Sequence, residues 1–272
     1  MKLVRLIIAL SVLSICGKVA IAADLHPIVK VQSGYLFGAT ANGKWIKAEE
    51  AAKSLPSETT YQVYGLTEAV GEAKASKATL EGAPCEETLP VSLSPKPEKG
   101  VIAIAAPWNA LPRKPKVIDP TQKVYLDVVR DFLRTREIDQ PKVKIDNIVR
   151  VDLDGDGEDE VLIIATNYFK KDDRVPMRSP AGSYSMVLLR RQVAGKVETQ
   201  LVEGEFHPKA YLRSEDSFDA PNAYKVIATL DLDRDGKLEV VVGSNYYEGE
   251  EITIYRCDRK KVEALLSVSC DA

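Results

Sequence analysis

Asp152-Leu-Asp-Gly-Asp-Gly-Glu-Asp-Glu-Val161 is the most informative segment of this chain, and a second copy follows it, Asp231-Leu-Asp-Arg-Asp-Gly-Lys-Leu-Glu-Val240. Both copies have the form D-x-D-x-D-G-x-x-E. Carboxylates at positions 1, 3 and 5 repel one another unless a cation lies among them, and the glycine at position 6 permits the sharp turn that gathers them. Calcium, a hard cation that takes about six to eight oxygen ligands, suits such a loop better than metals that prefer His or Cys. The sequence therefore predicts up to two calcium ions.

Apolar, β-branched segments lie on both sides of each loop. They span 148–151 and 161–165 around the first copy, and 226–230 and 240–244 around the second. Such residues favour strands, so each loop is expected to be the turn of a β-hairpin. The loops are not EF-hands, because an EF-hand has a Glu at position 12 and flanking helices. Here the acid comes at position 9.

This order of apolar strand, acidic loop and apolar strand resembles the FG-GAP or integrin-like calcium repeats and the related VCBS-type repeats of bacterial surface proteins. The resemblance covers the two loops and their flanking strands, in the C-terminal part only. In that family the loops usually belong to β-propeller blades. A closed propeller needs at least about four blades, and only two copies are recognisable here. The resemblance implies calcium binding but no particular activity.

The resemblance also assigns ligands by position, namely the three aspartates, the acid at position 9 and the backbone carbonyl at position 7. These residues are Asp152, Asp154, Asp156, Glu158 and Glu160 in the first loop, and Asp231, Asp233, Asp235, Lys237 and Glu239 in the second. Arg234 and Lys237 lower the negative potential of the second loop, so we expect it to bind calcium more weakly. The alternative is that both are acidic turns without metal, because Asp and Gly are common turn residues.

Residues 1–22 have the pattern of a secretory signal peptide, in which Lys2 and Arg5 precede an apolar run that ends at Ala20-Ile-Ala22. We expect cleavage after Ala22 and a periplasmic or extracellular location. No later segment is long and apolar enough to span a bilayer, so no membrane insertion is expected after cleavage. The whole chain has a formal net charge of −3, and the signal carries basic but no acidic residues. A mildly acidic mature protein argues against nucleic acid as a partner.

Three cysteines remain after the predicted cleavage, namely Cys85, Cys257 and Cys270. In an oxidising compartment they allow one disulfide and one free thiol. A hairpin of 252–257 with 262–268 would place Cys257 opposite Val262, so we favour a Cys85–Cys270 bridge. The other pairings, and a fully reduced protein, stay open because pairing cannot be deduced from sequence.

The chain divides, by composition, into a small β-rich N-terminal domain over 23–115 that ends in a proline-rich connection, and a domain over 116–272 that contains both loops. Asn42-Gly43 is a strong hairpin signal. A short helix is expected over 47–54, and Trp108 is expected to fill the junction between the halves; the alternative for Trp108 is a platform for a sugar or peptide. Strands are expected at 27–31, 34–38, 43–46, 61–64, 77–80, 90–93 and 101–105.

One amphipathic helix is expected after residue 118, with Asp119 as its N-cap and Pro120 at its first position. Its apolar stripe consists of Tyr125, Val128, Val129, Phe132 and Leu133. A hairpin is expected from 183–190 and 196–202. The predicted fold class is thus mainly β (α+β), with β-hairpins that carry the calcium loops and one packed helix; the alternative is a partial or irregular β-propeller.

No catalytic motif is recognisable. His26 and His207 are the two histidines, and zinc-hydrolase, nucleophile-elbow and phosphate-loop motifs are absent. The main hypothesis is therefore a binding, adhesion or envelope-associated module with structural calcium, whose polar loops 170–182 and 203–221 contact an unknown protein or glycan. The alternative is a carbohydrate-active hydrolase that uses carboxylates near Glu248. A third possibility is a purely structural exported protein.

Overall fold

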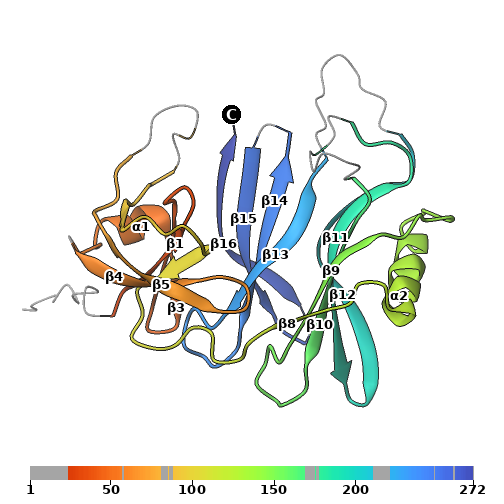
Figure 1. Cartoon of the computed structure of the whole chain (residues 1–272), viewed down its shortest axis with the longest axis horizontal. Coiled ribbons are helices and arrows are strands. Elements are labelled where there is room, and N and C mark those ends of the chain that lie inside the picture. Colours follow the sequence, from red (N-terminus) through yellow and green to blue (C-terminus); the bar gives the residue numbers. More distant parts are fainter. Residues whose placement is uncertain are drawn as a thin grey trace, which may run out of the picture.

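The structure is a computed structural model that describes residues 24–56, 58–80, 85, 88–168, 175, 178–210, 221–247, 249–259 and 261–271. The predicted signal peptide lies outside the described residues. Within them the protein is mainly β, with sixteen strands in three antiparallel sheets and two helices (Figure 1). No sheet of the described part closes on itself. The mainly β class is confirmed, and the propeller alternative stays a prediction.

The first sheet has seven strands in the order β3-β2-β1-β7-β4-β5-β6. They are β1 His26–Lys30, β2 Leu36–Ala41, β3 Lys44–Lys47, β4 Thr59–Tyr64, β5 Ala69–Ala75, β6 Leu93–Ser94 and β7 Ile102–Ile104. The Asn42-Gly43 pair connects β2 to β3 with both residues at positive φ, as a hairpin turn of this kind requires. Helix α1, Ala48–Ala52, follows β3 and buries Ala51 against the outer face of the sheet.

The second and third sheets come from the rest of the chain. The second has the order β12-β11-β10-β9-β8, with β8 Lys116–Ile118, β9 Ile145–Val151, β10 Glu160–Thr166, β11 Ser183–Val193 and β12 Lys196–His207. The third has the order β13-β14-β15-β16, with β13 Ala223–Leu230, β14 Glu239–Tyr246, β15 Gly249–Cys257 and β16 Val262–Asp271. Each acidic segment connects two neighbouring antiparallel strands, β9 to β10 and β13 to β14. The predicted hairpins are therefore present.

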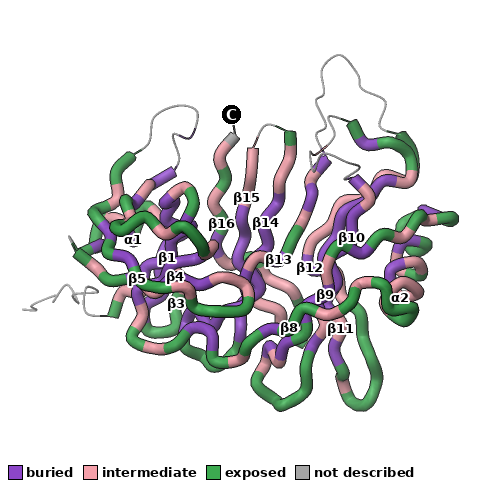
Figure 2. Tube along the Cα trace, in the orientation of Figure 1, coloured by how far each residue is buried: buried purple, intermediate pink, exposed green. Residues whose placement is uncertain are grey.

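The third sheet lies between the other two and is buried on both faces (Figures 1 and 2). Successive residues of β14 point to opposite faces. Val241 packs with Ile28 and Ile104 of the first sheet, whereas Val240 and Val242 belong to the core shared with the second sheet. Full burial of such a side chain contributes about 1.5–3 kcal/mol. The first and third sheets share one core although they come from different sides of residue 115. The predicted division of the chain into two domains there stays a prediction.

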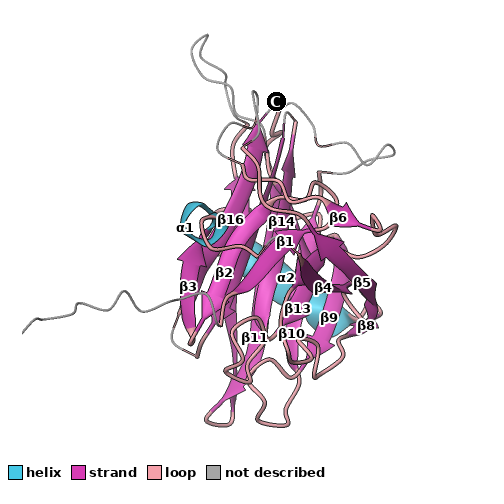
Figure 3. Cartoon of the chain, turned by 90° about the vertical axis from the view of Figure 1, so that its left-hand side faces the viewer, coloured by secondary structure: helices cyan, strands magenta, loops and turns pink. Residues whose placement is uncertain are grey.

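Helix α2, Lys123–Arg134, covers the outer face of the second sheet and lies behind the strands in the side view (Figure 3). Its apolar stripe is confirmed, because Val129 and Leu133 are completely buried there. The predicted start of the helix is wrong. The Asp119 carboxylate accepts hydrogen bonds from the backbone N–H of Thr121, at 2.8 Å, and from its hydroxyl. This local turn uses up the capping group, so the helix begins later. No helix among the described residues has the length and apolarity to cross a membrane.

Two other expectations are wrong, and two strands were not predicted. Residues 77–80 form no strand and have no regular secondary structure. The polar segment predicted over 203–221 begins as part of β12, which continues to His207. Strands β5 and β8 were not predicted, because their mixed sequences lack a clear alternation of apolar and polar residues. Their pairing with β4 and β9 is decided by tertiary context.

A disulfide joins Cys85 to Cys270, which are 185 residues apart in the sequence, and so confirms the favoured pairing. Cys257 is a free thiol and lies opposite Val262, as expected. Burial raises the pKa of Cys257 to about 12, so this thiol is a poor nucleophile at neutral pH. The bridge links β16 to the N-terminal half of the chain.

We expect the double variant Cys85→Ser/Cys270→Ser to lose about 2–5 kcal/mol of unfolding free energy, because the bridge closes a long loop of the unfolded chain. Denaturant unfolding measures this. Cys257→Ser is the matched control and should unfold at nearly the midpoint of the unchanged protein. Equal midpoints for all three proteins would contradict the bridge.

Candidate metal centres

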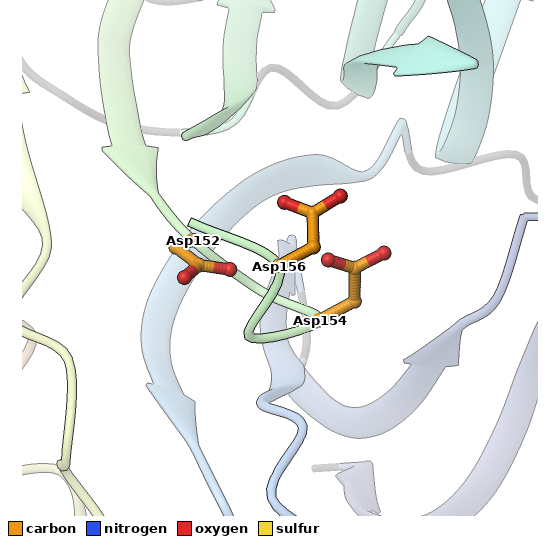
Figure 4. Close-up of side chains that lie close together, drawn as sticks. All are labelled: Asp152, Asp154 and Asp156. Carbon is orange, nitrogen blue, oxygen red and sulfur yellow. The ribbon is translucent and has the colours of Figure 1, made fainter. Parts of the chain in front are cut away.

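The first acidic loop begins where β9 ends. Carboxylate oxygens of Asp152, Asp154 and Asp156 lie within 4.8 Å of one another, and Figure 4 shows the last two projecting side by side. The backbone N–H groups of Gly155 and Gly157 donate to Asp152 at 2.6 and 3.1 Å. These bonds fold the loop around its first aspartate and bring the three predicted side chains together.

The second loop gathers Asp231, Asp233 and Glu239 within the same 4.8 Å limit. This set is more deeply buried than the first, with exposed fractions of 6%, 8% and 1%. The N–H of Gly236 donates to the Asp231 carboxylate at 3.2 Å, which is equivalent to the bond from Gly157 to Asp152 in the first loop. Asp235, a predicted ligand, is not part of this cluster; its carboxylate accepts a hydrogen bond from the N–H of Lys237 at 2.8 Å.

The glutamate at position 9 closes the base of each loop. Glu160 accepts from the N–H of Leu153 at 2.7 Å, and Glu239 accepts from that of Leu232 at 3.0 Å. Burial raises the pKa of both carboxyl groups, that of Glu239 to about 9. Glu160 is not part of the first cluster, and the carbonyls at position 7 of each loop stay predicted ligands.

Both loops have the same backbone course at position 4. Gly155 has a φ of 79° and Arg234, at the equivalent place, has a φ of 64°. A non-glycine residue rarely adopts this left-handed conformation, because its Cβ comes too close to the backbone. The hydrogen bonds and the strands on either side therefore impose the loop geometry. Glycine is favoured at position 4 but is not required there, since Arg234 adopts the same conformation.

The donor atoms fit calcium. Every side-chain donor in both clusters is a carboxylate oxygen, which is the donor type that calcium prefers. Oδ1 of Asp154 and Oδ1 of Asp231 are buried and accept no hydrogen bond from any described residue. An unsatisfied buried acceptor costs about 1–3 kcal/mol, and a charged one costs more. Burial raises the pKa of Asp231 and Asp233, and a cation among these oxygens would offset that cost.

Two arginines near the β15–β16 turn contact the clusters. Arg256 lies 2.6 Å from the Asp233 carboxylate, and Arg259 lies 3.5 and 3.3 Å from those of Asp154 and Asp156. The Lys237 ammonium is 3.1 Å from Asp258, so it is directed away from the ligands of its own loop. Residues of the first loop and of this turn line a cleft of about 650 Å³.

Comparison with protein-family models, with curated proteins and with solved structures finds no match. The FG-GAP resemblance therefore depends on the two loops alone and stays a prediction.

The acidic patch of the hydrolase alternative has other contacts where it is described. Glu248 itself lies outside the described residues. Glu250 forms an ion pair with Lys30, and Glu251 accepts a hydrogen bond from Thr253 at 3.4 Å. These contacts do not identify a pair of carboxylates that could flank a glycosidic bond, and they give no information on the predicted role of Glu248. The hydrolase alternative therefore stays a prediction.

Sequence reasoning missed three cationic residues around the loops, Arg113, Arg256 and Arg259. They have no local signal, because each contacts a loop from a distant part of the sequence. Trp108 was expected at the domain junction. It packs against the core between the first and third sheets, and its indole N–H donates to the Asp231 carbonyl at 2.8 Å.

We expect Glu239→Gln to change metal-free stability by less than about 1 kcal/mol, because the raised pKa keeps this carboxyl largely protonated at neutral pH and Gln keeps the bond from Leu232. The same substitution should remove most of the stabilisation that calcium gives through the second loop. Melting temperatures with calcium and with chelator measure both effects. Equal calcium-induced shifts in the variant and the unchanged protein would exclude Glu239 as a ligand.

We expect Arg259→Gln to raise calcium affinity at the first loop roughly 2- to 5-fold. Its guanidinium is exposed, and an exposed ion pair contributes about 0.2–1 kcal/mol. Calcium must break the ion pairs of Arg259 with Asp154 and Asp156 in order to bind these carboxylates. Lys261→Gln is the matched control, because Lys261 is on the same turn but pairs with Glu263. Calorimetric titration gives both affinities; unchanged or weaker binding in Arg259→Gln would contradict the competition.

Proposed function

We propose that this protein is an exported calcium-binding module in which two ions complete the β9–β10 and β13–β14 hairpin turns. One observation supports this most directly. The two acidic loops have the same sequence pattern, and in each the glycine at position 6 donates to the first aspartate. Each loop also contains a buried carboxylate oxygen without a hydrogen-bond partner among the described residues. Simple acidic turns would not need to bury such oxygens.

The calcium in this proposal is structural. Leu153 and Leu238 are loop residues, yet each is only 3% exposed and belongs to the core between the second and third sheets. An ion that fixes the loop backbone therefore also fixes these two side chains in the core. When bound, calcium supplies positive charge and oxygen coordination; the chain supplies the carboxylates and the turn that presents them.

The proposed role is binding or adhesion at the cell envelope. Rigid hairpin ends beside a charged cleft provide a surface for a protein or glycan partner, and the cleft is lined by both acidic and basic residues. The disulfide supports export, because such bonds persist in oxidising compartments. The loops predicted to contact a partner lie in part outside the described residues.

We expect calorimetric titration to give two calcium ions per chain, and melting to occur at higher temperature in calcium than in chelator. Calcium at about 100 times its Kd adds about 2.7 kcal/mol per site. Asp154→Asn and Asp233→Asn should each reduce the stoichiometry to one ion. Unchanged melting and no calcium uptake would overturn the proposed function.

A further inference from the structure

The two acidic loops touch each other, although they belong to different sheets. The N–H of Leu238, in the second loop, donates to the Leu153 carbonyl of the first at 2.8 Å. Gly155 faces the Gly236 carbonyl closely enough that a Cβ added to it would lie 3.5 Å from that oxygen. Residues directly after two predicted ligands, Asp152 and Asp235, thus take part in contacts between the loops.

Arg113 connects the same loops through its side chain. Its Nε donates to the Asp152 carbonyl at 2.5 Å, and its Nη2 donates to the carbonyls of Leu153 and Gly236 at 3.3 and 2.8 Å. One planar guanidinium therefore binds three carbonyls, two in the first loop and one in the second. Such a fork has a fixed geometry, so it accepts these carbonyls in few relative orientations.

The segment that carries Arg113 also holds the second loop by its backbone. The N–H of Asp231 donates to the Ala110 carbonyl at 2.8 Å, and Trp108 donates to the Asp231 carbonyl. Asp231 and Asp152 are the first aspartates of their loops. The connection between the N- and C-terminal parts of the chain thus contacts both sites at the same ligand position.

We propose that the two loops bind calcium cooperatively and that Arg113 is the residue that couples them, an inference that rests on the proposed function. An ion in the first loop orders Asp152 to Asp156 and so fixes the carbonyls that hold Arg113 and Leu238. These groups in turn hold the second loop, which then loses less conformational freedom when it binds its own ion. By thermodynamic reciprocity, occupancy of the second loop favours the first by the same factor.

Repulsion between two divalent ions opposes this coupling. It is weakened in salt, because the screening length is about 8 Å at physiological ionic strength. The direct contacts between the loops, in contrast, are hydrogen bonds of 2.8 Å, far shorter than this screening length, so salt weakens them less. Coupling between sites typically changes affinity about 5- to 150-fold. We expect the lower end of that range at physiological salt, where repulsion acts in the opposite direction.

The test is calorimetric calcium titration of the mature chain and of two one-site variants, Asp154→Asn and Asp233→Asn. Cooperative loops predict that each one-site variant binds its remaining ion at least about 5-fold more weakly than the unchanged protein binds the same ion at the second step. Remaining-site affinities equal to or tighter than those of the unchanged protein would overturn the coupling while leaving calcium binding intact. No calcium uptake by any of the proteins would instead overturn the proposed function.

Arg113→Lys identifies the coupling residue. Lysine keeps the positive charge but lacks the planar fork, so this variant should still bind two ions. The ratio of the second-step affinity to the affinity of the same site in a one-site variant should fall towards one. Lys261→Gln is the control, because Lys261 pairs with Glu263 and forms no ion pair with either loop among the described residues, so it should leave the ratio unchanged. A ratio in Arg113→Lys equal to that of the unchanged protein would exclude Arg113 as the coupling residue.

Hydrogen exchange provides a second measurement that does not depend on an Arg113 variant. In Asp233→Asn, whose second loop is disabled, calcium in the first loop should slow exchange of the Leu238 amide, which donates to Leu153 across the loop contact. The Val241 amide, inside the third sheet, serves as the reference for global stabilisation. Slowing confined to Leu238 supports the coupling, and equal slowing of both amides argues against it.

Discussion

Repulsion between carboxylates that the backbone holds within 4.8 Å of one another is the constraint on which the rest of this structure depends. Backbone N–H groups offset part of that repulsion, because Asp152 and Asp231 accept hydrogen bonds from within their own loops. Arg256, at the end of β15, and Arg259, in the turn that follows it, offset another part. The buried oxygens left without partners are what a hard cation would satisfy.

The third sheet explains why these loops have a structural importance beyond their own turns. It is covered on one face by the first sheet and on the other by the second, so its position decides the relative position of both. The β13–β14 turn is one end of this central layer, and the β9–β10 turn is at the adjacent end of the second sheet. Changes in either loop therefore reach a core through Leu153 or Leu238.

Local patterns predicted the hairpins well and the ends of some elements poorly. The strands around each acidic segment followed from β-branched runs, and the turn glycines followed from the φ that they must adopt. Asp119 was assigned to the helix as its cap, but its carboxylate closes a turn at Thr121 first. Both arrangements satisfy the same rule for capping residues, and only the three-dimensional course of the chain selects one.

The sequence alone determined the acidic loops, their flanking strands and the oxygen-only chemistry of the two clusters, because each depends on residues a few positions apart. Only the tertiary structure decided that the two loops are neighbours. Arg113 reaches the first loop across 39 residues and the second across 123, and no local pattern encodes either contact. Glu239, a ligand predicted from its position in the loop, lies in the second cluster, and only the structure shows that Asp235 is not part of it.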